Sequence, residues 1–175
     1  MSWNVGHINR GLYFYGFSHT PFHKLNLPDR TFTISYFRDP IERLLSHYNM
    51  LVEMRHTNID HPCMEVEGLW LGDGLDCFLR RIPKEHLLAQ LYMFSRHYNI
   101  GDALENVQRL GYYFFSDNFN DGVRAINHRT GLQLQPLHVR KTDSQVQVSA
   151  AQLTRLRVML AAEYAFVELI RAAPG

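Results

Sequence analysis

The chain has 175 residues, of which 46% are hydrophobic and 20% charged, and this balance predicts one globular domain over residues 1–175 with a hydrophobic core. A formal net charge of +1 gives no field that would favour nucleic acid, and no apolar run approaches the roughly 20 residues of a membrane span. No signal-peptide core lies before residue 10, which favours the cytoplasm. The two cysteines, Cys63 and Cys77, lack the spacing of a zinc site and predict either two reduced thiols or one disulfide.

The first elements that the sequence predicts are two strands and a helix. Aromatic residues at 12–16 and β-branched and aromatic residues at 31–37 favour strands. A helix is expected over residues 40–54, because Asp39 is a good N-cap, a proline fits the first helical position, and Glu42 completes a D-x-x-E box. Apolar side chains recur on one face of this helix: Ile41, Leu44, Leu45, Tyr48, Leu51 and Val52.

The middle of the chain predicts a loop followed by mostly helical structure. The loop is expected over residues 55–71, where the polarity is mixed, and the length and position of residues 55–72 make them a candidate acceptor loop. The elements expected after it are helices at 73–82 and 84–97 with a break at Pro83, a helix at 102–110, a core strand at 111–116, and a helix at 119–130 that stops at Gly131.

The last part predicts a polar extended segment over residues 133–148 and then one long helix capped by Ser149. Apolar residues mark one stripe of that helix: Leu153, Leu156, Leu160, Tyr164 and Val167. Strands that alternate with helices predict an α/β fold with a parallel sheet covered by helices. Sheets of this kind bind ligands beyond the carboxyl ends of their strands.

The segment TFTISYFRDPIERLLSHYNML, residues 31–51, combines groups that suit an anion. Arg38 follows the predicted strand, and its planar guanidinium matches phosphate oxygens. Ser46 lies on the predicted helix opposite its apolar face, flanked by Arg43 and Asn49. The segment therefore predicts an anion site made by Arg38 and the Ser46 hydroxyl. The alternative is that Arg38 pairs with its neighbouring aspartate and that Ser46 is a solvated helix residue.

The pattern R-D-P-x-x-R-x-x-S-x-Y, carried by Arg38, Asp39, Pro40, Arg43, Ser46 and Tyr48, resembles the 3′-phosphate-binding motif of carbohydrate-type sulfotransferases. The heparan sulfate 2-O- and 6-O-sulfotransferases belong to that family. The resemblance implies a three-layer, P-loop NTPase-like parallel sheet flanked by helices. It also implies that Arg38 and Ser46, with Arg43 beside them, hold the 3′-phosphate of 3′-phosphoadenosine 5′-phosphosulfate (PAPS), and that a hydroxyl of a saccharide or small molecule is the acceptor.

Three further segments resemble the same family in the same order: SHTPFHKL at 18–25, YYFFSDNFNDGVRAI at 112–126 and HVRKT at 138–142. The first implies that His19 is the catalytic base, with a capped turn before Pro21 as the alternative. His23 is a weaker candidate, either structural or facing the acceptor. The last implies that Arg140 and Lys141 close over the nucleotide, with a solvated basic pair as the alternative.

The sequence departs from the family because residues 1–175 contain no loop of the type H-x-P-K-T-A-G-T-[ST], which cradles the 5′-phosphosulfate in complete members. The segment Gly6 to Gly11 has no Lys-[ST] ending and does not replace it. We therefore expect a sheet without its first strand-loop-helix unit, in a fragment or a degenerate relative that transfers sulfuryl groups weakly or not at all. If the native chain is longer, the prediction of a cytoplasmic location no longer holds, and a Golgi location or a membrane anchor are the alternatives.

Two other functions fit parts of the sequence. A non-catalytic nucleotide- or anion-binding relative, acting as a binding module, agrees with the missing loop. A small P-loop kinase agrees less well, because no Walker-type loop is present. No metal is expected, since the spacing of His47, His56, His61 and Cys63 fits no familiar metal site and the family's transfer reaction needs none.

Overall fold

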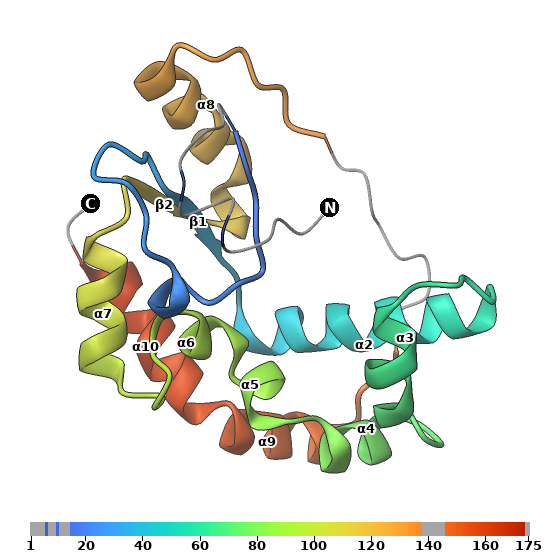
Figure 1. Cartoon of the computed structure of the whole chain (residues 1–175). Helices are drawn as coiled ribbons and strands as arrows, with labels where there is room; N and C mark the ends of the chain where they lie inside the picture. The colour runs from blue at the N-terminus through green and yellow to red at the C-terminus, as the bar shows by residue number, and fades with distance from the viewer. Residues whose placement is uncertain (1–5, 7–9, 11–14, 138–145, 174–175) are drawn as a thin grey trace. The chain divides into compact units, whose positions relative to one another are not determined.

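The computed structural model describes residues 6, 10, 15–137 and 146–173, and Figure 1 shows its elements. Contacts within the chain divide it into two units. Unit 1 contains Met1–Phe37, Gln90–Pro136 and Ala165–Gly175, and unit 2 contains Arg38–Ala89 and Leu137–Tyr164. Among the described residues, every helix is too short or too polar to cross a lipid bilayer.

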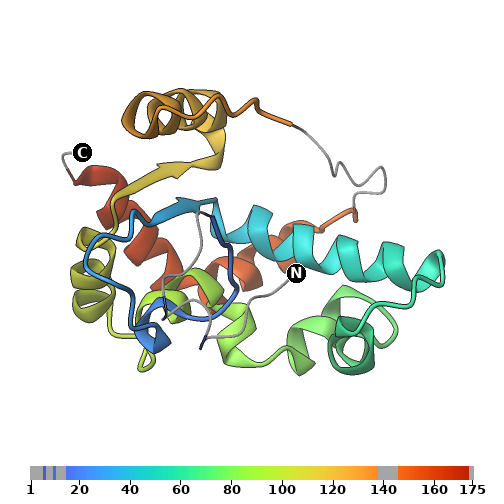
Figure 2. The same ribbon diagram turned by 45° about the horizontal axis from the view of Figure 1, so that its top comes forward.

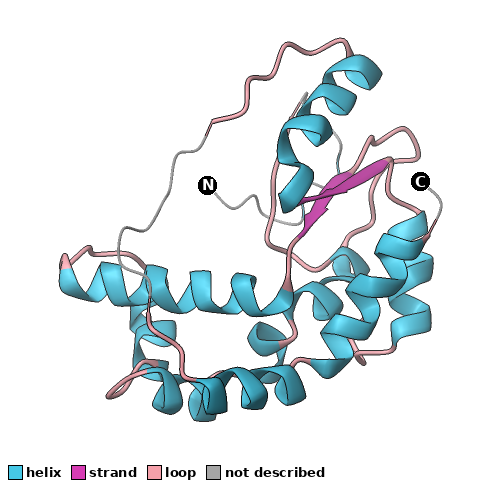
Figure 3. Cartoon of the chain, turned by 180° about the vertical axis from the view of Figure 1, so that it is seen from behind, coloured by secondary structure: helices cyan, strands magenta, loops and turns pink. Residues whose placement is uncertain are grey.

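Unit 1 contains a small parallel sheet of two strands, β1 (Ile34–Phe37) and β2 (Tyr112–Phe115). Ile34 lies opposite Tyr112 and Phe37 opposite Phe115, so the strands pair in register along their whole length. Figure 3 shows the two strands side by side among the helices. The predicted α/β class with parallel strands at 31–37 and 111–116 is confirmed. Residues 15 and 16 lie outside any strand, and residues 12–14 lie outside the described part of the chain.

The core of unit 1 is built around Phe37, which is 1% exposed at the end of β1. Its ring lies 5.6 Å from that of Phe94 and 6.0 Å from that of Phe166, distances typical of favourable aromatic pairs. Phe94 ends α6 (Ala89–Phe94), and Phe166 lies on α10 (Ala161–Ala172). The other buried members of this cluster are Leu91, Ala103, Val107, Val167 and Ile170.

Helix α8 (Phe119–Thr130) packs on β2 at a position that requires glycine. A Cβ atom on Gly122 would lie 2.4 Å from the ring of Phe114, far inside normal contact distance. The helix ends at Gly131, whose φ of 72° is left-handed, as the sequence predicted. Helix α7 (Ile100–Gln108) also agrees with its prediction and begins where the side chain of Asn99 accepts from the Asp102 amide at 3.0 Å.

Unit 2 contains α2 (Pro40–His56), one continuous helix in both views (Figures 1 and 2). The predicted N-cap is confirmed, since Asp39 Oδ1 accepts from the Glu42 amide at 2.9 Å. The predicted loop at 55–71 is wrong, because α3 (Cys63–Val66) and the 3₁₀ helix η2 (Glu67–Trp70) occupy much of it. Its mixed polarity comes from helices that bury only one side, with Trp70 8% exposed and Leu69 68% exposed.

Two predicted helices are each divided in the structure. The break at Pro83 is confirmed between α4 (Leu75–Arg81) and α5 (Lys84–Leu87), but a second break at Leu88 separates α5 from α6. The predicted cap at Ser149 is confirmed, and the structure shows it as a capping box with Gln152, but the long final helix ends as α9 (Ala150–Met159), and α10 starts after Leu160. Leu88 and Leu160 stand at the two breaks and are 4% and 0% exposed, and neither break is marked by a proline or glycine in the sequence.

Candidate functional site

The sequence motif at 38–48 forms the start and first turns of α2 in unit 2. Its carboxylate, Asp39, is used twice inside this unit. One oxygen caps α2, and the other accepts a hydrogen bond from the Tyr164 hydroxyl at 2.8 Å. Asp39 therefore joins the start of α2 to α10 and has no oxygen left that lacks a partner.

Arg43 is held by internal contacts of unit 2. Its Nε lies 3.0 Å from Glu163 Oε1, and the side chain of Glu163 is 0% exposed. The Nη atoms of Arg43 donate to two main-chain oxygens at the end of α5, those of His86 and Leu87. Each nitrogen of the guanidinium thus donates a hydrogen bond to the protein itself. We conclude that Arg43 positions α5 and α10 against α2, a role different from the ligand contact that the resemblance implies.

Arg38 and Ser46, the two predicted phosphate ligands, are separated along the motif by Glu42. Glu42 and Ser46 are four residues apart on α2 and therefore share a face. The Nε atom of Arg38 lies 3.5 Å from Glu42 Oε2, and both side chains are solvent-accessible, at 38% and 63% exposure. No hydrogen bond of the half-buried Ser46 hydroxyl occurs among the described residues. An anion at this face would meet Arg38 and Ser46, with the Glu42 carboxylate between them as a competitor.

The remaining residue of the motif, Tyr48, is a core residue of unit 2. It is 6% exposed, and its ring lies 5.2 Å from that of Phe78. Burial raises the pKa of its hydroxyl. Tyr48 is therefore a neutral packing residue, as the sequence analysis expected.

His19, the predicted base, is an exposed residue of unit 1 whose ring lies 6.2 Å from that of Phe17. The turn beside it is closed by Ser18, whose hydroxyl accepts from the Thr20 amide at 2.9 Å, so that turn needs no cap from His19. His23 is half-buried, with its ring 5.4 Å from that of Tyr92. Burial, with smaller contributions from nearby cations, lowers the pKa of His23, so this imidazole is neutral near pH 7.

The two basic residues of the last family segment, Arg140 and Lys141, lie outside the described residues. Cys63 and Cys77 are free thiols, in agreement with the reduced alternative.

A second polar cluster in unit 2 escaped the sequence analysis. It brings together His47 on α2, Glu67 at the start of η2 and His86 on α5, with their ligand atoms all within 4.8 Å of one another. The carboxylate of Glu67 accepts from His47 Nε2 at 2.6 Å, and this hydrogen bond holds the pKa of Glu67 below its usual value. Burial lowers the pKa of His86. No spacing signal in the sequence links the three residues, because each comes from a different element.

Compared with models of protein families, with curated proteins and with solved structures, the chain gives no match. Any function must therefore be argued from the motif and from the geometry of the described residues.

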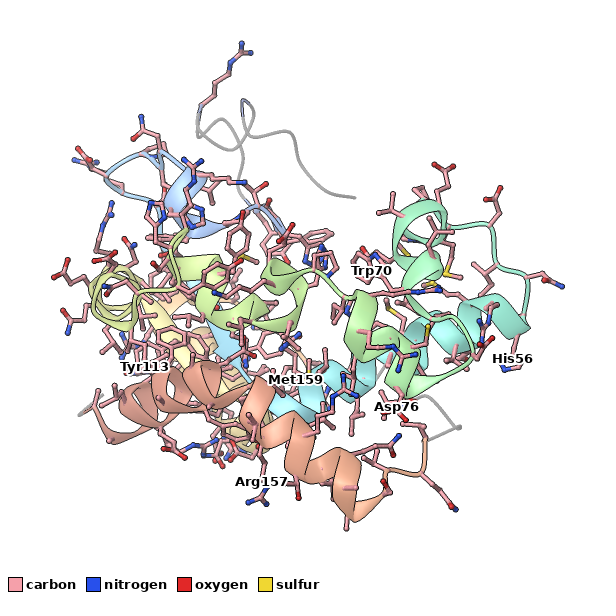
Figure 4. The ribbon with its side chains drawn as sticks, turned by 90° about the horizontal axis from the view of Figure 1, so that it is seen from below. His56, Trp70, Asp76, Tyr113, Arg157 and Met159 are labelled. Carbon is pink, nitrogen blue, oxygen red and sulfur yellow. The ribbon has the colours of Figure 1, made fainter. Side chains whose placement is uncertain are left out.

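The first prediction concerns the role of Arg43. Arg43→Met should lower the free energy of unfolding by about 3–5 kcal/mol, because it leaves the carboxylate of Glu163 buried and without its cation. The measurement is urea unfolding followed by circular dichroism. Arg155→Met is the matched control, since Arg155 pairs with Asp76 (labelled in Figure 4) at a distance of 3.5 Å on the surface of unit 2, and it should cost less than about 1 kcal/mol. If Arg43→Met lowers the free energy of unfolding no more than Arg155→Met does, the structural role of Arg43 is contradicted.

The second prediction concerns Tyr164 and pH. Burial, followed by the hydrogen bond and charge of Asp39, raises the pKa of Tyr164 to about 12. Because this value lies above the usual value of about 10, the stabilisation is fully present below about pH 10 and is lost as the pH rises through about 12. Tyr164→Phe should lower the free energy of unfolding by about 1 kcal/mol at neutral pH. Urea unfolding at several pH values should show this difference shrinking above about pH 10, and a constant difference would contradict the assignment.

Proposed function

We propose that this chain provides the 3′-phosphate-binding site of a PAPS-dependent sulfotransferase that modifies a hydroxyl of a saccharide or small molecule. The observation that carries the proposal is the R-D-P-x-x-R-x-x-S-x-Y pattern on a strand, a capped turn and a helix. Two residues of this pattern, Asp39 and Arg43, are engaged in hydrogen bonds and an ion pair within unit 2. Arg38 and Ser46, the two residues to which the resemblance gives the phosphate, are both half-buried, and among the described residues the Ser46 hydroxyl has no hydrogen bond.

The physical chemistry of this face suits a phosphate dianion. The guanidinium of Arg38 offers a planar set of donors, and the Ser46 hydroxyl offers one more. Glu42 opposes the anion, because its carboxylate lies beside Arg38. A surface pair of this kind is worth about 0–1 kcal/mol, so a doubly charged phosphate can displace it. The proposal also implies a P-loop NTPase-like fold. The parallel pairing of β1 and β2 is the feature of the structure that supports it.

A non-catalytic nucleotide-binding module is the second candidate. The observation in its favour is that the printed sequence has no phosphosulfate loop with a Lys-[ST] ending. Binding of the remote 3′-phosphate stabilises substrate and transition state alike, so Arg38 and Ser46 alone cannot accelerate the transfer. Both candidates share the nucleotide site and differ only in whether sulfuryl transfer follows.

The third prediction tests the shared site with adenosine 3′,5′-bisphosphate. Calorimetry should detect binding to the wild type, and Arg38→Ala should weaken it by about 1.5–3 kcal/mol, the scale of a charge-assisted hydrogen bond. Ser46→Ala should weaken it by about 0.5–1.5 kcal/mol. Glu42→Gln should instead strengthen it by up to about fivefold, because the competing carboxylate is removed.

Two controls make this experiment specific. Arg80 is an exposed arginine of the same unit, and Arg80→Ala should leave the affinity unchanged. Adenosine 5′-monophosphate lacks the 3′-phosphate and should not distinguish the wild type from Arg38→Ala. Equal affinity of the wild type and Arg38→Ala for the bisphosphate would rule out the site and, with it, both candidate functions.

The fourth prediction separates the two candidates. Residues 1–175 should transfer sulfuryl groups from PAPS slowly or not at all, because loss of even one donor to the reacting oxygens costs about 10²–10³ in rate. The measurement is transfer of labelled sulfate to a panel of saccharide and small-molecule hydroxyls. If a longer native chain supplies the missing loop, His19→Ala in that chain should lower turnover by about 10²–10⁴ with unchanged nucleotide affinity. Activity that is the same in that chain with and without His19 would exclude the proposed base.

A further inference from the structure

Three potential metal ligands converge in unit 2 from separate elements. His47 lies on α2, Glu67 begins η2, and His86 lies on α5. One ligand atom from each lies within 4.8 Å of the other two, and His47 Nε2 is 2.6 Å from Glu67 Oε2. This group has no residue in common with the Arg38–Ser46 face.

The surroundings of the three side chains are largely aromatic. The ring of Trp70 lies 4.7 Å from that of His86 and 6.2 Å from that of His47, and Phe78 lies 6.1 Å from His47. Trp70 and Phe78 are 8% and 0% exposed. The side chains of His47 and Glu67 keep 17% and 22% exposure, so a small ion has a path from solvent. A partly dry shell of this kind strengthens coordination and leaves access for exchange.

The elements that carry His47 and His86 are held together by hydrogen bonds of Arg43, which is not itself one of the three metal ligands. Arg43, one helical turn before His47 on α2, donates to the main-chain oxygen of His86 at 3.1 Å. The same arginine is anchored by the buried carboxylate of Glu163. His47 and His86 are therefore brought together by the framework of unit 2. Preorganised ligands of this kind lower the cost of binding an ion.

The distances suit a metal after a small rearrangement. Zinc binds imidazole nitrogen and carboxylate oxygen at about 2.0–2.2 Å, which places neighbouring ligand atoms of a tetrahedral site about 3.3 Å apart. His47 and Glu67 would separate slightly from their hydrogen-bonded distance of 2.6 Å, and His86 would move inward.

We propose that His47, Glu67 and His86 form a site for a single zinc ion, with water or another small ligand in the fourth position. Two imidazoles and one carboxylate are a ligand set that zinc accepts, whereas magnesium and calcium favour oxygen ligands. The proposal goes beyond nucleotide binding, and it departs from the expectation of no metal that the spacing in the sequence suggested. It does not depend on the proposed sulfotransferase function.

A neighbouring pair offers a competing zinc site. His61 Nδ1 lies 3.0 Å from the thiol of Cys63, and a thiolate is also a good zinc ligand. Burial, and to a smaller degree the charge of Glu67, raises the pKa of Cys63 and disfavours the thiolate. The experiment must nevertheless separate the two sites, which requires a substitution at each.

The fifth prediction is tested by zinc titration of the whole chain, freed of metal with a chelator and dialysed, in competition with a chromophoric chelator. One zinc ion should bind per chain. Glu67→Gln, which keeps the size of the side chain, and His86→Ala should each weaken zinc binding by at least about 100-fold. Cys63→Ser and His56→Ala should leave it unchanged. His56, labelled with Trp70 in Figure 4, lies at the end of α2 and outside the cluster.

A second readout protects the test against loss of folding. Zinc should raise the melting temperature of the wild type and of Cys63→Ser, but not that of Glu67→Gln, whose fold is checked by circular dichroism. Cobalt(II) in place of zinc should quench part of the tryptophan fluorescence, which comes from Trp3 and Trp70, and this quenching should be lost in Glu67→Gln. Failure of the wild type to compete for zinc would overturn the proposal. So would normal zinc binding by Glu67→Gln, or loss of binding in Cys63→Ser. If His86→Ala does not fold, the wild type and Glu67→Gln still decide the matter.

Discussion

The carboxylate of Glu163 is completely excluded from solvent, and unit 2 is arranged around the cation that compensates it. Arg43 provides that cation and, with its remaining donors, also satisfies the last main-chain oxygens of α5. A buried pair of this kind adds little stability compared with apolar residues, but loss of one partner is expensive. Its main consequence is therefore geometric: it ties the start of α10, the end of α5 and the first turns of α2 to one another.

This constraint determines how the motif at 38–48 should be interpreted. The pattern resembles a phosphate site, yet Asp39 and Arg43 serve contacts within unit 2, and Tyr48 lies in its core. These three residues thus belong to the local framework, whereas Arg38 pairs with the exposed Glu42 and the half-buried Ser46 hydroxyl has no hydrogen bond among the described residues. A sequence pattern cannot separate framework from ligand contacts, because both place the same residue types at the same spacing.

The features that the sequence predicted well are those determined by local backbone chemistry. The Asp39 cap, the break at Pro83 and the stop at Gly131 are each decided within a few residues. The features that it missed depend on packing between distant residues. The break at Leu160 has no proline or glycine to mark it, and the helices within 55–71 bury Trp70 while leaving Leu69 exposed, so neither shows a simple local pattern. His47 and Glu67 are 20 residues apart in sequence, so no helical or strand periodicity connects them.

The hydrogen bond between His47 and Glu67 compensates the negative charge of the Glu67 carboxylate. A carboxylate at 22% exposure, beside aromatic rings, needs a positive group or a donor nearby. The N–H of His47 meets this need in the structure, and a divalent cation would meet it more completely while also engaging His86. In the zinc proposal, this short contact is the place where an external cation would share the negative charge of Glu67.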